Sequence, residues 1–205
     1  TVRGRVGDNH PAVARELSML GNLDLLRART VTGNERQGLA DRAQARFERV
    51  IEIQTKVYGA EDLRLDDAFH NLGLARVLSG DLEGGREALA RALELTSRRL
   101  REDHPDVIET KAELGDCLIQ LGQLEKGEAL LDEVLRVREA GGVKGKSLGT
   151  VRLALAARFV NEDPTRSRAL LEAAIVELGA PDELQIIYKE KVARLTEKLG
   201  NSGGR

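Results

Sequence analysis

Three places in the sequence hold residue types that could do chemistry, by their spacing or by their reactivity. At the first, Asp66 and His70 lie one helical turn apart, a spacing that suits either a surface ion pair or two ligands of one metal ion. A zinc site needs three or four ligands, and no third one lies nearby in the sequence. We therefore predict no metal site here.

The second place is the stretch Ala140–Ser147, which reads Ala-Gly-Gly-Val-Lys-Gly-Lys-Ser. It matches the relaxed phosphate-loop pattern of a small residue, four residues and then Gly-Lys-Ser. That motif binds phosphate only between a buried strand and a helix, because its backbone N–H groups must converge on the anion. An amphipathic helix ending near Glu139 precedes it here. We therefore predict a connector between two helices and reject a nucleotide site.

The third place is Cys117, the one cysteine of the chain. No histidine falls on an adjacent turn to activate its thiol, so we predict a buried structural residue. A single cysteine cannot form an internal disulfide, and the N-terminus has no signal-peptide core, so we predict a cytoplasmic location. The carboxylates form no acid–base pair. We predict no catalytic residue, no cofactor and no enzymatic activity.

The composition narrows the choice of partner. The chain has 205 residues, of which 41% are hydrophobic and 32% charged, as expected of a folded soluble protein. Its formal net charge of −2 provides no field for nucleic acid, and 2% aromatic residues leave few stacking platforms for single strands. No apolar run is long enough to cross a membrane. We therefore expect a protein or peptide partner. Because the chain lacks an initiator Met, we expect it to be a segment of a longer protein.

A repeat of 42 residues between Phe47 and Val137 determines the predicted architecture. Repeats of this length built from paired helices cannot bury their apolar faces alone, so they stack on one another. We predict an all-α fold, a right-handed α-solenoid of antiparallel helix pairs. The matching positions are Leu72 and Leu114, Gly73 and Gly115, Gly80 and Gly122, Leu82 and Leu124, Gly85 and Gly127, Leu89 and Leu131, and Leu93 and Leu135.

Apolar spacing and glycines predict where the helices begin and end. In the clearest copy, a first helix from Leu65 ends at Ser79-Gly80-Asp81, where glycine suits a left-handed cap and Asp81 can cap the second helix. Glycine inside a helix costs about 1 kcal/mol, so the recurring helical glycines indicate a close approach of two helices. The predicted single domain spans 8–200, with repeats at about 10–60, 62–102, 104–142 and 146–179, a C-terminal capping helix over 182–199, and linkers or tails at 1–7 and 200–205.

The first repeat is longer than the others. The linker 101–107 has a second copy at 7–13, and the two histidines, His10 and His104, are 94 residues apart, which is two periods plus ten residues. We assign the extra residues to Arg29–Gly38 and expect a longer connection between the two helices of this repeat. Each histidine precedes a proline, and we expect both to form turn hydrogen bonds.

These residues resemble the tetratricopeptide repeat, with its small residue after Leu in the first helix of a pair and another in the second. The 42-residue spacing and the linker 101–107 resemble the longer repeats of kinesin light chains and of bacterial multidomain proteins. The resemblance covers about residues 8–180. It implies a non-catalytic scaffold that binds an extended peptide or a partner helix in its concave groove. The alternative is a regulatory or sensor arm of a larger bacterial enzyme, either a protein kinase or a caspase-like protease.

The resemblance also implies which residues line the groove, once Leu72-Gly73 is placed at the family's core position. Asn71 falls where related repeats place an asparagine that hydrogen-bonds a peptide backbone. Four acidic residues would lie near the middle of the groove, so we expect a basic or neutral partner segment. The predicted groove residues are Arg15, Met19, Asn22, Asp67, His70, Asn71, Leu74, Glu109, Glu113 and Asp116.

Overall fold

The structure is a computed structural model, and it describes residues 7–142, 145–179 and 185–201. Every regular element within these ranges is helical, which confirms the all-α prediction. The helices form two compact units, Thr1–Thr110 and Lys111–Arg205, and the division falls inside one helix, α6.

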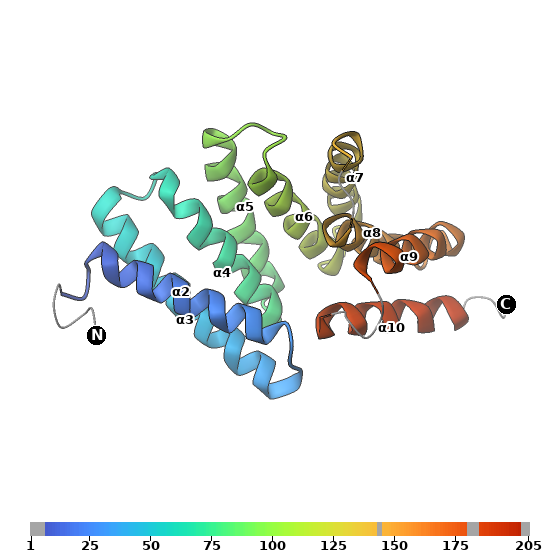
Figure 1. Ribbon diagram of the computed structural model, residues 1–205, viewed down its shortest axis with the longest axis horizontal. Coiled ribbons are helices and arrows are strands. Elements are labelled where there is room, and N and C mark those ends of the chain that lie inside the picture. The colour runs from blue at the N-terminus through green and yellow to red at the C-terminus, as the bar shows by residue number, and fades with distance from the viewer. Residues whose placement is uncertain (1–6, 143–144, 180–184, 202–205) are drawn as a thin grey trace. The chain divides into compact units, whose positions relative to one another are not determined.

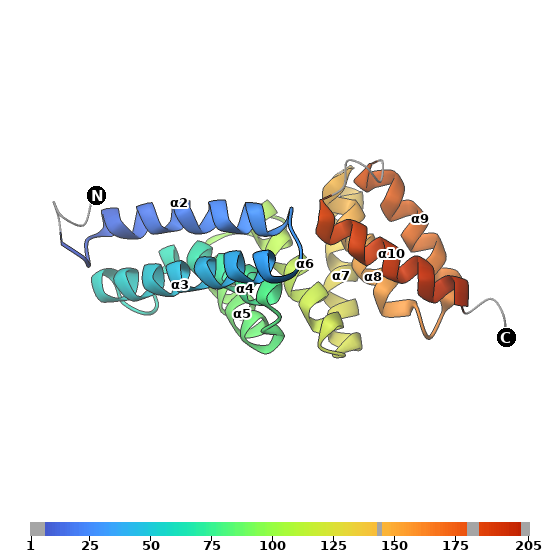
Figure 2. The same cartoon turned by 90° about the horizontal axis from the view of Figure 1, so that it is seen from below.

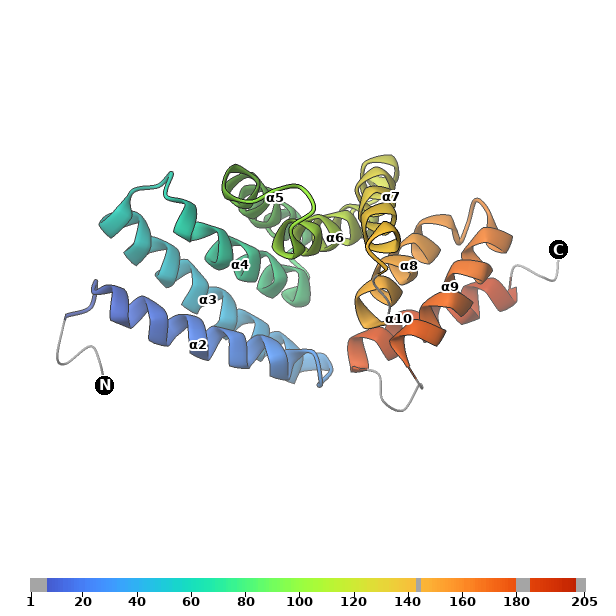
Figure 3. The same cartoon turned by 45° about the horizontal axis from the view of Figure 1, so that its top comes forward.

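Unit 1 consists of two helix pairs and the first part of α6. In the first pair α2 packs along α3, and in the second α4 packs along α5 (Figure 1). The helices α3 and α4 also pack on each other, so the two pairs stack as predicted for repeats (Figure 3). The elements are α2 (Pro11–Ala28), α3 (Gly33–Tyr58), the short 3₁₀ helix η1 (Leu63–Leu65), α4 (Asp66–Ser79), α5 (Leu82–Arg99) and α6 (Pro105–Gln120).

Unit 2 contains the rest of α6 and four more helices. The pair α8 and α9 shares a core with α10, in which Leu195 and Leu199 of α10 join Val160 and Leu171 (Figure 2). The predicted C-terminal helix is therefore present from Ile186, and positions 182–184 lie outside the described residues. The elements are α7 (Leu124–Ala140), α8 (Lys146–Phe159), α9 (Pro164–Leu178) and α10 (Ile186–Asn201).

The predicted break between α4 and α5 is confirmed by its geometry. Gly80 has a φ of 91°, in the left-handed region that favours glycine, and it ends α4. Asp81 begins α5, because its Oδ1 accepts a hydrogen bond of 3.0 Å from the backbone N–H of Gly84. The two residues together reverse the chain and satisfy backbone groups at both helix ends.

The predicted turn hydrogen bonds of the two histidines are also confirmed. His10 accepts the backbone N–H of Ala12 through Nδ1 at 3.1 Å. His104 accepts the N–H of Asp106 in the same way at 3.2 Å. Both imidazoles therefore satisfy a free N–H in the first turn of a helix, α2 in one case and α6 in the other.

The extra residues of the first repeat do not form the long connection predicted at Arg29–Gly38. Only residues 29–32 join the two helices, and α3 begins at Gly33. The insertion instead lengthens the helices: α2 has 18 residues and α3 has 26, against 14 for α4 and 18 for α5. Leu39 and Ala40 are buried against the unit, and a helix extended back from them keeps its backbone hydrogen bonds at a cost of about 1 kcal/mol for Gly38.

The recurring glycines do mark close contacts between paired helices, as predicted. A Cβ added to Gly73 would lie 2.6 Å from Cγ of Leu89, and one added to Gly115 would lie 2.8 Å from Cγ of Leu131. Real Cβ atoms do not approach so closely, so each pair packs at a distance that only glycine allows. The two leucines are themselves one repeat apart, and the same contact is therefore used twice.

We expect alanine at two helical glycines to have opposite effects on the free energy of unfolding. Gly73→Ala should lower it by about 1–3 kcal/mol, because overpacking against Leu89 exceeds the gain in helix propensity. Gly38→Ala meets no heavy atom within 4 Å and should raise it by about 0.5–1 kcal/mol. Urea denaturation followed by circular dichroism would measure both. Equal effects at the two positions would contradict the close approach.

Candidate functional site

The predicted groove residues divide between the two units. Glu113 and Asp116 belong to unit 2, and the other eight belong to unit 1, where they lie on α2, α4 and the first part of α6.

The outer side of α2 is an exposed apolar surface. Arg15, Met19 and Asn22, all predicted to line the groove, are exposed on this helix. Four large apolar residues are exposed with them, and the opposite side of α2 is buried in the core of unit 1 through residues such as Val13 and Leu25. We call the four residues the apolar face of α2: Met19 is 70% exposed, Leu20 40%, Leu23 52% and Leu26 58%.

Two of the α4 residues predicted to face an open groove are used inside unit 1. Leu74 is buried in a cluster with Leu25 of α2 and Phe47 of α3, which corrects its assignment to the groove surface. The reason is that α2 and α4 pack directly on each other and close this side of α4. His70 is half-buried, and its Nδ1 lies 3.0 Å from Oγ1 of Thr110.

The remaining unit 1 positions are accessible. Asp67 and Glu109 are exposed, and Asn71 is half-buried. Asn71 donates through Nδ2 to the carbonyl oxygen of Asp67, one turn earlier in α4, at 2.9 Å. The accessible predicted residues of unit 1 are thus the three on α2, Asp67, Asn71 and Glu109.

In unit 2 the predicted groove residue Asp116 forms an ion pair with the C-terminal helix. Lys191 of α10 donates to Oδ2 of Asp116 at 2.5 Å. Burial lowers the pKa of Lys191, but the negative charges of Asp116 and Glu113 outweigh that effect and raise it. The helix α10 therefore supplies a cation to the surface that the sequence predicted to be open and acidic, and the groove assignment of Asp116 stays a prediction.

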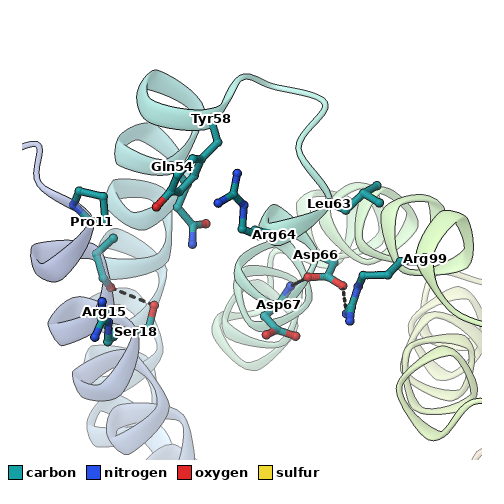
Figure 4. Close-up of a pocket in the computed structure, with 11 residues that line it drawn as sticks. Pro11, Arg15, Ser18, Gln54, Tyr58, Leu63, Arg64, Asp66, Asp67 and Arg99 are labelled. Carbon is teal, nitrogen blue, oxygen red and sulfur yellow. Dashed lines mark hydrogen bonds and ion pairs between the residues drawn. The ribbon is translucent and has the colours of Figure 1, made fainter.

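A cavity of about 420 Å³ lies in unit 1, lined by the first half of α2, the end of α3, η1, the start of α4 and the end of α5 (Figure 4). Arg15 and Asp67 were predicted from the sequence, whereas Gln54, Tyr58 and Arg64 come from the end of α3 and from η1 and were missed. These three types are common on helix surfaces and do not recur 42 residues later, where Thr96, Leu100 and Asp106 stand, so no pattern marks them. The lining residues are Pro11, Ala14, Arg15, Ser18, Gln54, Tyr58, Leu63, Arg64, Asp66, Asp67 and Arg99.

Asp66 forms the deepest ion pair of this pocket. It is buried, and its Oδ2 accepts from Nη2 of Arg99 at 2.5 Å. Its Oδ1 accepts the backbone N–H of Asp67 at 2.9 Å. Both oxygens therefore have partners other than His70, so the spacing of Asp66 and His70 does not correspond to a direct pair in the structure.

Arg64 forms the second ion pair of the pocket. It donates to both carboxylate oxygens of Asp62, through Nε and Nη2, at 2.7 Å each. This guanidinium lowers the pKa of Asp62 to about 2. The guanidinium carbon also lies 3.6 Å from the ring centroid of Tyr58, a cation–π contact. The charge of Arg64 is thus matched within its own segment.

Asp67 differs from its neighbour because no donor among the described residues pairs with its carboxylate. The residue is open to solvent on one side, yet desolvation at the pocket wall raises the pKa of this carboxyl, and the negative charge of Asp66 adds to the effect. Arg99 and His70 oppose it. Among the residues that the structure describes, the pocket therefore contains one acidic group whose charge no ion pair neutralises.

The other candidates from the sequence take ordinary structural places. Cys117 is buried, as predicted. The stretch Ala140–Ser147 lies between α7 and α8, with residues 143–144 outside the described part. In the ranges that the structure describes, no group of three or more His, Cys, Asp and Glu residues could hold a metal ion. No helix within these ranges is long and apolar enough to span a bilayer.

The fold and the glycine contacts define the class of this protein as a helical-repeat protein. Residues 65–140 match the family model of the tetratricopeptide repeat, in agreement with the resemblance seen in the sequence. The 42-residue register that predicted it covers the same helices. Proteins of this family are protein–protein interaction scaffolds.

Solved structures of similar fold include proteins from Podosopora anserina and from P. vanneervenii. A protein of Podosopora anserina assigned as a kinesin light chain, with nearly identical TPR-like repeats, is 21% identical and has a TM-score of 0.66, with 94% of this chain and 89% of that chain covered. BtubC (BKLC) from P. vanneervenii is 17% identical, with a TM-score of 0.60 and coverage of 95% and 89%. At these identities the likeness is one of fold. A comparison with curated protein sequences finds no match.

Proposed function

We propose that this chain is a non-catalytic scaffold that binds a segment of a protein partner, extended or helical, on the α2 side of unit 1. The observation that supports this proposal is the apolar face of α2. Soluble proteins rarely leave several large apolar side chains exposed side by side, and such patches mark interaction sites. Met19, Leu23 and Leu26 follow the spacing of one helix face, so a partner segment can contact all of them at once.

The exposed acidic residues of unit 1 favour a basic or neutral segment. Asp67 and Glu109 are exposed, and no cation among the described residues forms an ion pair with Asp67. In unit 2, by contrast, Lys191 already neutralises Asp116. The same surface would also serve a regulatory arm of a larger bacterial enzyme, with the partner segment supplied by that enzyme. That alternative stays a prediction.

The proposal is tested by selecting peptides from a random library displayed on phage and measuring their affinity by fluorescence anisotropy. Met19→Glu and Leu23→Glu are each expected to weaken binding about tenfold or more, because a carboxylate in an apolar contact is desolvated without a partner. Both positions are exposed, so the variants should fold normally.

A matched control lies on the other unit. Val176 of α9 is 82% exposed, and Val176→Glu should leave the affinity unchanged. If the library yields no binding peptide, or if all three variants bind as the wild type does, the proposed function is wrong.

A further inference from the structure

The pocket of unit 1 presents hydrogen-bond acceptors that the protein itself leaves unused. The side-chain Oε1 of Gln54 is buried and has no hydrogen-bond partner among the described residues. Burying a polar atom without a partner is unfavourable, so a ligand that donates to it would recover free energy. The Asp67 carboxylate lines the same pocket, and no donor in the described part of the chain pairs with it.

Ser18 adds a third acceptor. Its hydroxyl donates to the carbonyl oxygen of Ala14 at 3.0 Å, which uses its one hydrogen and leaves its oxygen lone pairs free. It comes from α2, on the opposite side of the pocket from Asp67 (Figure 4). The unused groups that line the pocket are thus a carboxylate, an amide carbonyl and a hydroxyl oxygen.

The arginines of the pocket do not cancel this acceptor character. Arg99 is held by Asp66 and Arg64 by Asp62, so both guanidinium charges are matched by carboxylates. Arg15 is exposed on α2, where its side chain can donate to the backbone carbonyl oxygens of a bound peptide. Asp67 remains the acidic group without a partner.

We propose that this pocket binds one Lys or Arg side chain of the partner segment that lies on the apolar face of α2. This inference rests on the proposed function and specifies its recognition chemistry. An ammonium group has three donors and a guanidinium has five, and neither accepts, which suits a site of unused acceptors. A cavity of about 420 Å³ has room for such a side chain.

The pocket and the apolar face are continuous along α2. Met19 lies one helical turn after Arg15, and Asn22 lies one turn after Ser18. A peptide that places apolar side chains on Met19 and the residues beyond it can therefore turn one basic side chain into the pocket. The expected partner segment has a Lys or Arg on one side of a short apolar stretch.

The environment of Asp67 supports the same ligand. Because the pKa of Asp67 is raised, its ionised form is disfavoured in the folded protein, and a bound cation would relieve this. Binding of a cation needs the ionised carboxylate of Asp67. The affinity for the peptide should therefore fall as the pH drops through the pKa of Asp67, which lies above the ordinary value of 3.8. The charged groups around it are Asp66, His70, Arg99 and Asp106, with Arg15 and Arg64 also lining the pocket.

The test uses peptides selected by phage display on the wild-type protein. Each Lys or Arg in a selected peptide is replaced in turn by norleucine, and each peptide is measured against wild type, Asp67→Asn and Glu102→Gln. Replacing the basic residue that enters the pocket should weaken peptide binding to the wild-type protein about tenfold. The same replacement should have little effect on peptide binding to the Asp67→Asn variant. Glu102→Gln removes the same charge from an exposed position outside the pocket, and there the full tenfold loss should remain.

The outcomes separate this inference from the proposed function. If selected peptides lose affinity on Leu23→Glu, but no basic residue couples to Asp67, the scaffold proposal stands and the pocket assignment is overturned. If no peptide is selected, the proposed function itself is overturned. The pH profile gives an independent reading: only the peptide that retains its basic residue should lose affinity on acidification, and parallel profiles for the two peptides would contradict the inference.

Discussion

Phe47→Ala is expected to lower the free energy of unfolding of unit 1 by about 3–5 kcal/mol, through lost burial and the cavity left behind. Phe47 is 1% exposed and lies in the core where α2, α3 and α4 meet, beside Leu25 and Leu72. The ring also fits against Gly21 of α2, where an added Cβ would lie 2.7 Å from Cζ of Phe47. No neighbouring side chain at Gly21 can move in to fill the space, so the cavity should persist.

The matched control is Val57→Ala on the same helix. Val57 is 45% exposed, and its truncation should change the free energy of unfolding by less than about 0.5 kcal/mol. Urea denaturation followed by circular dichroism would compare the two. Because the ring of Phe47 packs against Gly21 of α2, Phe47→Ala should also weaken peptide binding to α2. Similar unfolding energies for the two variants would contradict the packing around Gly21.

The contact between Phe47 and Gly21 belongs to a repeating pattern, which explains why the fold could be predicted from the sequence. Phe47, Leu89 and Leu131 occupy one register at 42-residue intervals, and each packs against a glycine of the preceding helix. Buried apolar residues and close-contact glycines recur because every pair must bury the same face against its neighbour. Helix pairs, their breaks and the buried Cys117 all follow from that periodicity.

Features that do not repeat could not be predicted in this way. The ten extra residues of the first repeat extend α2 and α3, because burial of Leu39 outweighs the loop signal of Gly33 and Gly38. Lys191 reaches Asp116 across 75 residues of sequence, and nothing in the repeat register relates the two. Such contacts depend on how a helix docks, which the local spacing of residues does not encode.

The candidate site likewise contains residues that could be predicted from the sequence and residues that could not. Arg15, Met19, Asn22 and Asp67 were found because the resemblance assigns them to one face of the first helix in a pair. The pocket is completed by other residues, such as Gln54, whose type does not recur 42 residues later. Its unused acceptor atoms are a property of three-dimensional packing, and a sequence pattern contains no signal for them.

A second large effect is expected in unit 2, where Glu128→Ala should cost about 3 kcal/mol of stability. The side chain of Arg158 in α8 is almost fully buried, and its Nε donates to Oε2 of Glu128 at 3.0 Å. Its Nη1 lies 2.6 Å from Glu162, which is more than half exposed. Removal of Glu128 would leave a desolvated guanidinium with one partner whose charge is screened by solvent.

The informative comparison is Arg158→Met, which removes the buried cation and keeps an aliphatic side chain in its place. Replacing a buried charge by an apolar group of similar length is often close to neutral, so this variant should lose less stability than Glu128→Ala. Glu128 would not be left alone, since Nη1 of Arg166 lies 3.8 Å away. When Glu128→Ala is added to Arg158→Met, it should cause almost no further loss of stability, because the cation that Glu128 pairs with is absent.

Hydrogen exchange at the α8 amides would measure these variants within unit 2, because two compact units need not unfold in a single step. Glu128→Ala should increase exchange at α8 more than Arg158→Met does. The reverse order would mean that the packing of the Arg158 stem, and not the pairing of its charge, determines the stability of this helix.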